Sequence, residues 1–357
     1  MTDKSHPDET VLTIVQGKGT LPREQAGRNI HYDDASLSNY KMVQKGDFII
    51  HLRSFEGGLE MANENGIVSP AYTILRGKKP HSSRFYEAYF HTDEFVNHVL
   101  AKSVEGIRDG RQISYDAFKW LGLPYCSPSE QAKIAELFSV LTKRIEKQTV
   151  LVGSLKKYKR GVVSSILTHQ IKFADSEGKP YPEWTSCTLQ DAVVFLDGQR
   201  KPLESADRAK RQGQYPYYGA SGIIDYIDDY IFDEPLLLLG EDGANILNRS
   251  TPLCFIATGK YWVNNHAHVM RPKSGQNIKF LCELLESLDY TRYNTGTAQP
   301  KINQEKCREI KLSLPVYEEQ CRIASFLATL DRRLERAQSN LNYLLLIRDG
   351  LLQQLFI

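Results

Sequence analysis

The 357-residue chain lacks the features that mark several common classes of protein. Its six cysteines are scattered and none forms a Cys-x-x-Cys pair, so neither a zinc site nor a disulfide framework is indicated. No apolar run approaches the roughly 18 residues that a membrane helix needs. The polar stretch Met1 to Thr10 does not have the pattern of a secretory signal. We therefore expect a cytoplasmic protein with reduced thiols and no membrane association.

Neither positive nor negative charge predominates in the sequence. The formal net charge is +2, and the hydrophobic fraction of 41% is ordinary for a globular protein. This balance does not by itself indicate nucleic-acid binding, although a DNA-binding protein can gather its Lys and Arg residues on one face. The length favours two or more domains.

An internal repeat is the strongest signal in the sequence. Residues 129–135 read Ser-Glu-Gln-Ala-Lys-Ile-Ala, and residues 318–324 read Glu-Glu-Gln-Cys-Arg-Ile-Ala. The offset of 189 residues holds without a gap as far as Gly161 and Gly350. The chain therefore contains two copies of one segment.

Both copies have the pattern of a long helix. Apolar residues recur in steps of four and three, which is typical of a coiled-coil seam. Only Gln148 and Lys159 interrupt the seam in the first copy, and Ala337 and Arg348 interrupt it in the second. The first helix is predicted to begin with Ser127 as its N-cap. We expect the two helices to pair within the chain, with intermolecular pairing as the alternative. The seam positions are Ile134, Phe138, Leu141, Ile145, Val152, Leu155, Val162 and Ile166, and then Ile323, Leu327, Leu330, Leu334, Leu341, Leu344, Leu351 and Leu355.

A globular segment precedes each helix. Short apolar runs between Gly, Asn and Asp residues predict strands over 47–52, 72–75, 235–239 and 253–257. Helices are predicted over 85–99 and 278–288. The fold class is therefore α+β. The predicted order is a globular domain over 1–126, a long helix over 127–170, a connector over 171–181, a second domain over 182–315 and a second long helix over 316–357.

The first domain is predicted to start short. It has 70 residues before Ala71, whereas the second has 85 from Pro182 through His266. It also lacks a counterpart of the opening Pro182-Glu183-Trp184.

Several strings in their order resemble the specificity subunits of type I restriction–modification systems. They include the helix entry over 314–324, the junction 171–184, and the segments 215–223, 240–244 and 297–303 of the second domain. Residues 38–48 and 66–72 resemble another class of target-recognition domain. The resemblance covers nearly the whole chain.

The resemblance implies a function and a set of partners. Each domain would read one half of a split sequence in double-stranded DNA, and two long antiparallel coiled-coil helices would set the gap between the halves. The helices would also dock the modification (methyltransferase) subunits, which the restriction and translocase subunits join. The chain itself would bind no cofactor, since S-adenosylmethionine, ATP and Mg²⁺ would belong to the partner subunits.

Candidate DNA-binding residues follow from polar clusters beside predicted strands and in the matching loops, because Asn suits adenine edges while Lys and Arg suit guanine or phosphate. For each group the alternative is a solvated loop or, for a histidine, a hydrogen-bonded core residue. The candidates in the first domain are His51, Arg53, Ser54, Arg108, Arg111 and Gln112, and those in the second are Lys260, Asn264, Asn265, His266, His268, Gln299 and Lys301.

No catalytic motif stands out. The chain has no Walker loop, no metal-spaced Cys/His cluster and no Asn/Asp-Pro-Pro-aromatic motif of an adenine methyltransferase. The string Glu309-Ile310-Lys311 has the form of a nuclease motif, but it leads directly into the second long helix, so a solvent-facing strand is predicted. We expect a non-catalytic protein. The alternatives are a coiled-coil adaptor with protein-binding domains and a DNA-binding enzyme of unrecognised type.

Overall fold

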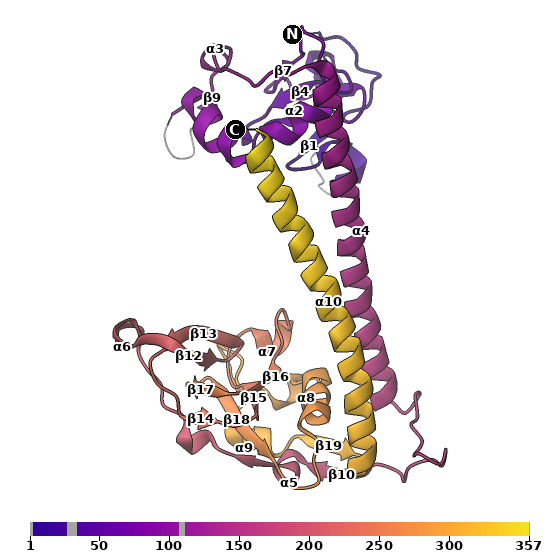
Figure 1. Cartoon of the computed structure of the whole chain (residues 1–357), viewed down its shortest axis with the longest axis vertical. Coiled ribbons are helices and arrows are strands. Elements are labelled where there is room, and N and C mark those ends of the chain that lie inside the picture. The colour runs from indigo at the N-terminus through magenta and orange to yellow at the C-terminus, as the bar shows by residue number, and fades with distance from the viewer. Residues whose placement is uncertain (1–2, 27–33, 107–110, 357) are drawn as a thin grey trace. The chain divides into compact units, whose positions relative to one another are not determined.

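The computed structural model describes residues 3–26, 34–106 and 111–356. Its two longest helices are α4 (Pro128–Leu167) and α10 (Tyr317–Leu355), labelled in Figure 1. The chain divides into two compact units. The first contains Met1–Leu151 and Ala337–Ile357, and the second contains Val152–Arg336. Each unit therefore includes part of both long helices.

The first unit is built from short strands around a small sheet of order β5-β4-β7. The hairpin β1–β2, the pair β3–β6 and the pair β8–β9 accompany it. The strands are β1 (Leu12–Val15), β2 (Gly19–Pro22), β3 (Lys41–Val43), β4 (Phe48–Ile50), β5 (Glu60–Met61), β6 (Gly66–Val68), β7 (Thr73–Leu75), β8 (Val104–Glu105) and β9 (Gln112–Ile113). The α-helices of this globular part are α1 (Ser54–Gly57), α2 (Ser83–Phe90) and α3 (Tyr115–Phe118).

The second unit contains two four-stranded sheets, β11-β18-β15-β16 and β13-β12-β17-β14, and the pair β10–β19. Its strands are β10 (Thr185–Thr188), β11 (Val193–Phe195), β12 (Gln212–Gly219), β13 (Gly222–Ile227), β14 (Phe232–Asp233), β15 (Leu236–Gly240), β16 (Cys254–Ala257), β17 (Lys260–Val263), β18 (Ala267–Pro272) and β19 (Lys311–Leu314). Its short α-helices are α5 (Leu189–Ala192), α6 (Ser205–Lys210), α7 (Asn245–Asn248), α8 (Ile278–Ser287) and α9 (Gln304–Arg308).

The two units share a central topology. In the first, β4 lies between β5 and β7 and pairs antiparallel with both. In the second, β15 lies between β16 and β18 in the same manner. A helix follows the third strand in each case, α2 after β7 and α8 after β18. The repeat therefore extends from the long helices into the globular parts.

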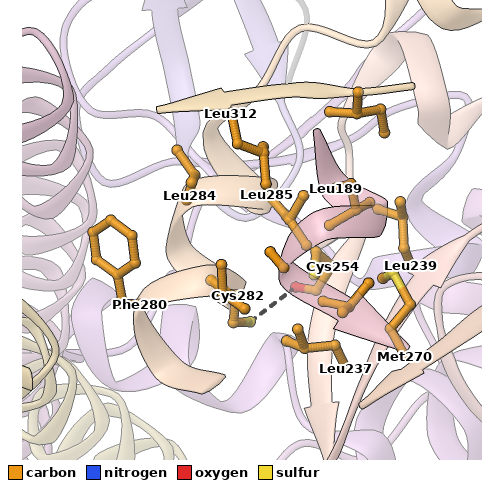
Figure 2. Close-up of a cluster of buried hydrophobic side chains, with 14 of the residues drawn as sticks. Leu189, Leu237, Leu239, Cys254, Met270, Phe280, Cys282, Leu284, Leu285 and Leu312 are labelled. Carbon is orange, nitrogen blue, oxygen red and sulfur yellow. Dashed lines mark hydrogen bonds between the residues drawn. The ribbon is translucent and has the colours of Figure 1, made fainter. Parts of the chain in front are cut away.

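The core of the second unit lies between β15, β16, α8 and the ends of both long helices. Figure 2 shows Leu237 and Leu239 of β15 facing Leu285 and Cys282 of α8. Both β15 leucines are completely buried, and such burial stabilises a fold by about 1.5–3 kcal/mol per side chain. The continuous apolar run over 236–239 is thus a strand covered on both faces.

The predicted seam packs within each unit. In the first unit, Phe138 of α4 belongs to one buried cluster with Phe356, which follows α10. In the second unit, Val162 and Ile166 of α4 share a cluster with Ile323 and Leu327 of α10. In both units, residues from one end of α4 meet residues from the opposite end of α10.

One interruption of the seam has a partner. Gln148 of α4 donates a hydrogen bond from its side-chain amide to the carbonyl oxygen of Ala337, 2.7 Å away. These two residues are 189 positions apart and therefore occupy equivalent positions in the repeat. At Leu355 the seam prediction is wrong, because this side chain is 40% exposed and the neighbouring Phe356 is buried instead.

Most predicted elements are present with shifted ends. Ser127 caps α4, since its hydroxyl oxygen accepts a hydrogen bond from the amide of Glu130. The helix predicted over 85–99 is divided: α2 ends at Phe90, and a separate π-helical turn covers Glu94–Val99. Thr92 separates the two, because its hydroxyl oxygen accepts a hydrogen bond from the amide of Phe95. Among the described residues, no helix is long and apolar enough to span a membrane.

Candidate nucleic-acid interface

A cluster of charged side chains lies at the end of β15 in the second unit. Arg200 binds the Glu241 carboxylate at 2.7 Å and reaches Asp197 at 3.5 Å. It also donates a hydrogen bond to the carbonyl oxygen of Ala267. Lys301, far along the chain from Arg200, also lies close to Glu241, with its Nζ 3.2 Å from a carboxylate oxygen. Two cations thus neutralise two largely buried carboxylates, so the cluster is a self-contained ion-pair network.

His268 completes this network from inside the core. Its Nδ1 lies 2.7 Å from Asp197 and its Nε2 lies 2.8 Å from the carbonyl oxygen of Ile302. Burial acts to raise the pKa of Asp197, but the hydrogen bond and charge of His268 and the amide of Val269 outweigh it and hold this pKa below its usual range. Asp197 is therefore ionised at neutral pH, and both partners of the imidazole are hydrogen-bond acceptors.

The ligand atoms of Asp197, Glu241 and His268 lie within 4.8 Å of one another, a spacing that also suits a metal ion. The donors around them argue for a different role. Arg200 binds both carboxylates, and Gln304 donates to the Asp197 oxygen that faces His268. A cation at this point would have to displace these donors. The cluster therefore joins segments of the chain rather than forming an open ligand set.

The network holds three loops together. The amide of Glu241 donates to the carbonyl oxygen of His266, and the amide of Gly243 donates to that of Pro300. The loop 294–301 is closed by Asn294, whose side-chain oxygen accepts hydrogen bonds from the amides of Gly296 and Lys301. Because a Cβ at Gly296 would lie only 1.8 Å from the carbonyl oxygen of Gln299, this turn requires glycine. The loops over 240–245, 264–267 and 294–301 thus form one joined surface.

Four of the predicted residues lie on this joined surface. Asn265, His266, Gln299 and Lys301 are exposed. His266 also contacts Asp242, with Nδ1 2.8 Å from a carboxylate oxygen. The structure therefore brings these four residues together, and their contact with DNA stays a prediction.

The other predicted residues of the second domain are placed differently. His268 is completely buried, with both ring nitrogens engaged, and Asn264 is 5% exposed with its side-chain oxygen bound to the amide of His266. Neither can reach DNA in this conformation, so both assignments are corrected to structural roles. Lys260 is exposed but lies at the opposite end of β17, over the ring of Tyr230. It is not part of the joined surface.

The first unit has a corresponding surface at the end of β4. His51, Arg53 and Ser54 follow this strand directly, as Glu241 follows β15. The guanidinium of Arg111 lies 4.5 Å from the ring centre of Phe55, which brings the segment with Arg111 and Gln112 against the same loop. Arg53, Arg111 and Gln112 are exposed.

Two further assignments in this unit need comment. Ser54 is completely buried, and its hydroxyl oxygen accepts a hydrogen bond from the amide of His51. The prediction that Ser54 contacts DNA is therefore wrong, because the residue shapes the turn. Arg108 lies outside the described residues.

His51 is a half-buried, neutral histidine. Burial lowers its pKa to about 4, with the charges of His91 and Arg53 acting in the same direction. Among the described residues its Nε2 has no hydrogen-bond partner. At neutral pH the side chain is therefore uncharged, and it cannot act as a phosphate-binding cation.

This placement predicts a pH dependence of stability. The unfolded chain binds a proton at His51 near pH 6.5 and the folded chain only near pH 4, so the unfolded state holds more protons in between. We expect the free energy of unfolding to have its highest value above pH 6.5, as far as His51 determines it, and to decrease as the pH falls toward 4. Urea midpoints of wild type and His51→Gln measure this. The variant should lose less stability, whereas His98→Gln at an exposed histidine should follow wild type. Parallel curves for wild type and His51→Gln would contradict the assignment.

Sequence reasoning missed the residues that organise the second surface. Arg200 and Asp197 had no motif to distinguish them, and Glu241 was noted only within the string 240–244. His266 precedes β18 and His268 lies within it, and no local pattern in the sequence distinguishes the exposed histidine from the buried one.

Part of the chain matches known proteins. Residues 181–342 match the family model described as the type I restriction modification DNA specificity domain. A Haemophilus influenzae protein assigned as a type I restriction enzyme specificity subunit is 32% identical over 149 residues, which cover 42% of this chain and 37% of that protein. The EcoprrI specificity subunit of Escherichia coli is 26% identical over 230 residues, covering 61% of this chain and 54% of that protein.

The fold is also similar to solved structures. A type I restriction–modification S subunit from M. genitalium aligns over 100% of this chain and 96% of that chain, with a TM-score of 0.62 and 17% identity. A chain from a study of complex assembly and conformational transition in the type I system aligns with a TM-score of 0.54 and 14% identity, over 100% of this chain and 94% of that chain. The resemblance inferred from the sequence is confirmed over residues 181–342, the part of the chain that matches the type I restriction modification DNA specificity domain. The aligned regions span about a third to a half of the curated relatives.

Proposed function

We propose that this chain is the DNA sequence-specificity subunit of a type I restriction–modification complex. The first unit reads one half of a split DNA sequence and the second unit reads the other half. The long helices α4 and α10 join the two recognition domains as an antiparallel coiled coil and define the gap.

The observation that carries the proposal is that the two units repeat one arrangement of strands and helix but carry different exposed side chains. Each unit places a polar, solvent-exposed surface at the end of its central strand, β4 or β15. The surfaces differ in chemistry, with Arg53, Arg111 and Gln112 on one and His266 and Lys301 on the other. Two copies of one scaffold with different surfaces are suited to recognising two different short sequences.

The chemistry of these residues fits DNA. Arginine and lysine bind guanine edges or phosphates, and Asn and Gln form paired hydrogen bonds with adenine. Backbone contacts fix the register while base contacts give the sequence. When both recognition domains belong to one chain, binding of the first domain to DNA holds the second domain near its own half-sequence. The second binding event is then effectively intramolecular, which raises the affinity for DNA without any new contact.

The chemistry of methylation and cleavage is assigned to partner subunits. The buried carboxylates of the second unit are bound by Arg200 and Lys301, so they do not form an open catalytic group. The proposal therefore gives this chain the role of a non-catalytic scaffold. Modification subunits would bring S-adenosylmethionine, and restriction subunits would bring ATP and Mg²⁺.

Selection from random DNA tests this function. The full chain, purified with its modification subunit, is incubated with a pool of random duplexes, and bound DNA is sequenced at two salt concentrations. We expect enrichment of a two-part sequence and a steep loss of affinity with salt, because phosphate binding releases counterions. Binding that does not enrich any sequence, or that does not depend on salt, would favour the adaptor alternative.

A further inference from the structure

A buried glutamine lies in the first turns of α4. Gln131 is completely buried. Its amide nitrogen donates a hydrogen bond to the carbonyl oxygen of Cys126, just before the helix, at 3.0 Å. Its Oε1 accepts a hydrogen bond from the backbone amide of Ser82 at 2.9 Å. Since Ser82 is the N-cap of α2, this one side chain connects α4 to the helix of the globular domain.

The second unit contains the same arrangement. Gln320 in the first turn of α10 is 1% exposed. Its amide nitrogen donates to the carbonyl oxygen of Pro315 at 3.0 Å, and its Oε1 accepts from the backbone amide of Asn277 at 2.9 Å. Asn277 is the N-cap of α8. A further bond to the side chain of Gln276 occurs only in this copy among the described contacts.

The two glutamines are equivalent within the repeat. Gln131 and Gln320 are 189 positions apart, as are the two carbonyl groups that they bind, on Cys126 and Pro315. Each gives a partner to one backbone donor and one backbone acceptor, and each lies where the domain meets its long helix. A leucine would fill the space but would leave two backbone groups unpaired, so the polar side chain specifies the geometry and not only the packing.

The helices that these glutamines hold lead directly to the candidate surfaces. α2 follows β7 and α8 follows β18, and these strands pair with β4 and β15, at whose ends the surfaces lie. A shift of α2 or α8 on its long helix would therefore move the surface of that unit.

We propose that Gln131 and Gln320 are positioning residues that fix each recognition domain on its own long helix and so determine the distance between the two half-sequences that the chain accepts. This proposal rests on the proposed reading of a split DNA sequence. Each glutamine acts on its own unit, so each variant affects one attachment and leaves the other intact.

The test uses the full chain in four forms: wild type, Gln131→Leu, Gln320→Leu and the control Gln338→Leu, which changes a partly exposed glutamine of α10 that bonds only to Asn342 among the described side-chain contacts. Hydrogen exchange measures the attachment directly. We expect exchange of the Ser82 amide to rise about tenfold in Gln131→Leu while that of Asn277 stays unchanged, and the reverse in Gln320→Leu, because one buried hydrogen bond is lost in each. The control should leave both amides protected.

Methylation mapping measures the consequence for recognition. Each form is co-expressed with the modification subunit in a host without adenine methylation. In Gln131→Leu and Gln320→Leu, we expect the ratio of methylation at the wild-type gap to methylation at gaps one base pair longer or shorter to fall about tenfold, with both half-sequences unchanged. If a leucine variant does not accumulate, Gln131→Met or Gln320→Met keeps the length of the side chain and removes both the donor and the acceptor, and the same two measurements apply.

The outcomes separate the two proposals. Unchanged exchange at Ser82 and Asn277, or a gap ratio equal to wild type while only total methylation falls, would overturn the positioning role. Absence of any methylated sequence in wild type would overturn the proposed function, and the exchange measurement would still decide whether the glutamines hold the domains.

Discussion

Replacing Arg200 with alanine is expected to destabilise the second unit by about 3–5 kcal/mol. Arg200 is 14% exposed and binds Glu241, which is 12% exposed, as well as Asp197 and a backbone carbonyl group. Removing it leaves two largely buried carboxylates with too few partners, which costs far more than the loss of a surface ion pair. Urea unfolding followed by tryptophan fluorescence measures the change, because Trp184 and Trp262 belong to this unit and Trp120 of the first unit is already 82% exposed.

A matched control lies on the same unit. Arg271 also pairs with a glutamate, Glu234, but the two side chains are 46% and 38% exposed. Arg271→Ala should cost less than about 1 kcal/mol, since surface ion pairs contribute little. Equal effects of the two substitutions would show that the Arg200 network is not the element that joins the loops.

Replacing Phe356 with alanine is expected to destabilise the first unit by about 3–5 kcal/mol, the usual cost of truncating a buried aromatic residue. Phe356 is 7% exposed and its ring centre lies 5.1 Å from that of Phe85 and 5.5 Å from that of Tyr89, both on α2. It also stacks near Phe138 of α4. One residue at the end of α10 thus connects α2 and α4.

Hydrogen exchange in α2 is the appropriate measurement, because it reports on the first unit alone. We expect protection there to fall by more than about a hundredfold in Phe356→Ala. The neighbouring Leu355 is 40% exposed, and Leu355→Ala should change protection little. If both variants behave alike, the contact of Phe356 with α2 does not stabilise the unit.

The long helices were the most predictable part of the fold. Their apolar seams follow from local periodicity in the sequence. Because the two copies repeat at a constant offset, the pattern seen in one helix can be checked against the other. Ser127 was recognised as an N-cap for a similar reason, since the cap is determined by the three residues that follow it. Phe356 could not be foreseen, because at the end of a helix the seam no longer decides which of two neighbouring residues is buried.

The candidate surfaces were predicted only in part. Polar residues beside a strand were predicted as a group, but sequence alone could not separate the exposed His266 from the buried His268. That distinction depends on Asp197 and Ile302, which are far from His268 in sequence. Ser54 and Asn264 were misassigned for a related reason: a short polar side chain in a turn often binds the neighbouring backbone, and this leaves no trace in composition. Contacts over long sequence separations therefore decide which polar residues remain available to a partner.

The same limit applies to Arg200 and to the two buried glutamines. Arg200 is separated from Glu241 by 41 residues, and Gln131 is separated from Ser82 by 49. Each of these residues was visible in the sequence, Gln131 and Gln320 even within the repeat. Only the structure shows that their polar groups are buried and paired.

The central claim is that one chain reads two DNA half-sequences at a fixed distance, and methylation mapping tests it most directly. The chain is co-expressed with its modification subunit in a host free of adenine methylation, and N6-methyladenine is located by single-molecule sequencing. The account predicts one split sequence with a constant gap, methylated only when the chain is present. A continuous sequence, or methylation that does not depend on the chain although the two proteins co-purify, would contradict it.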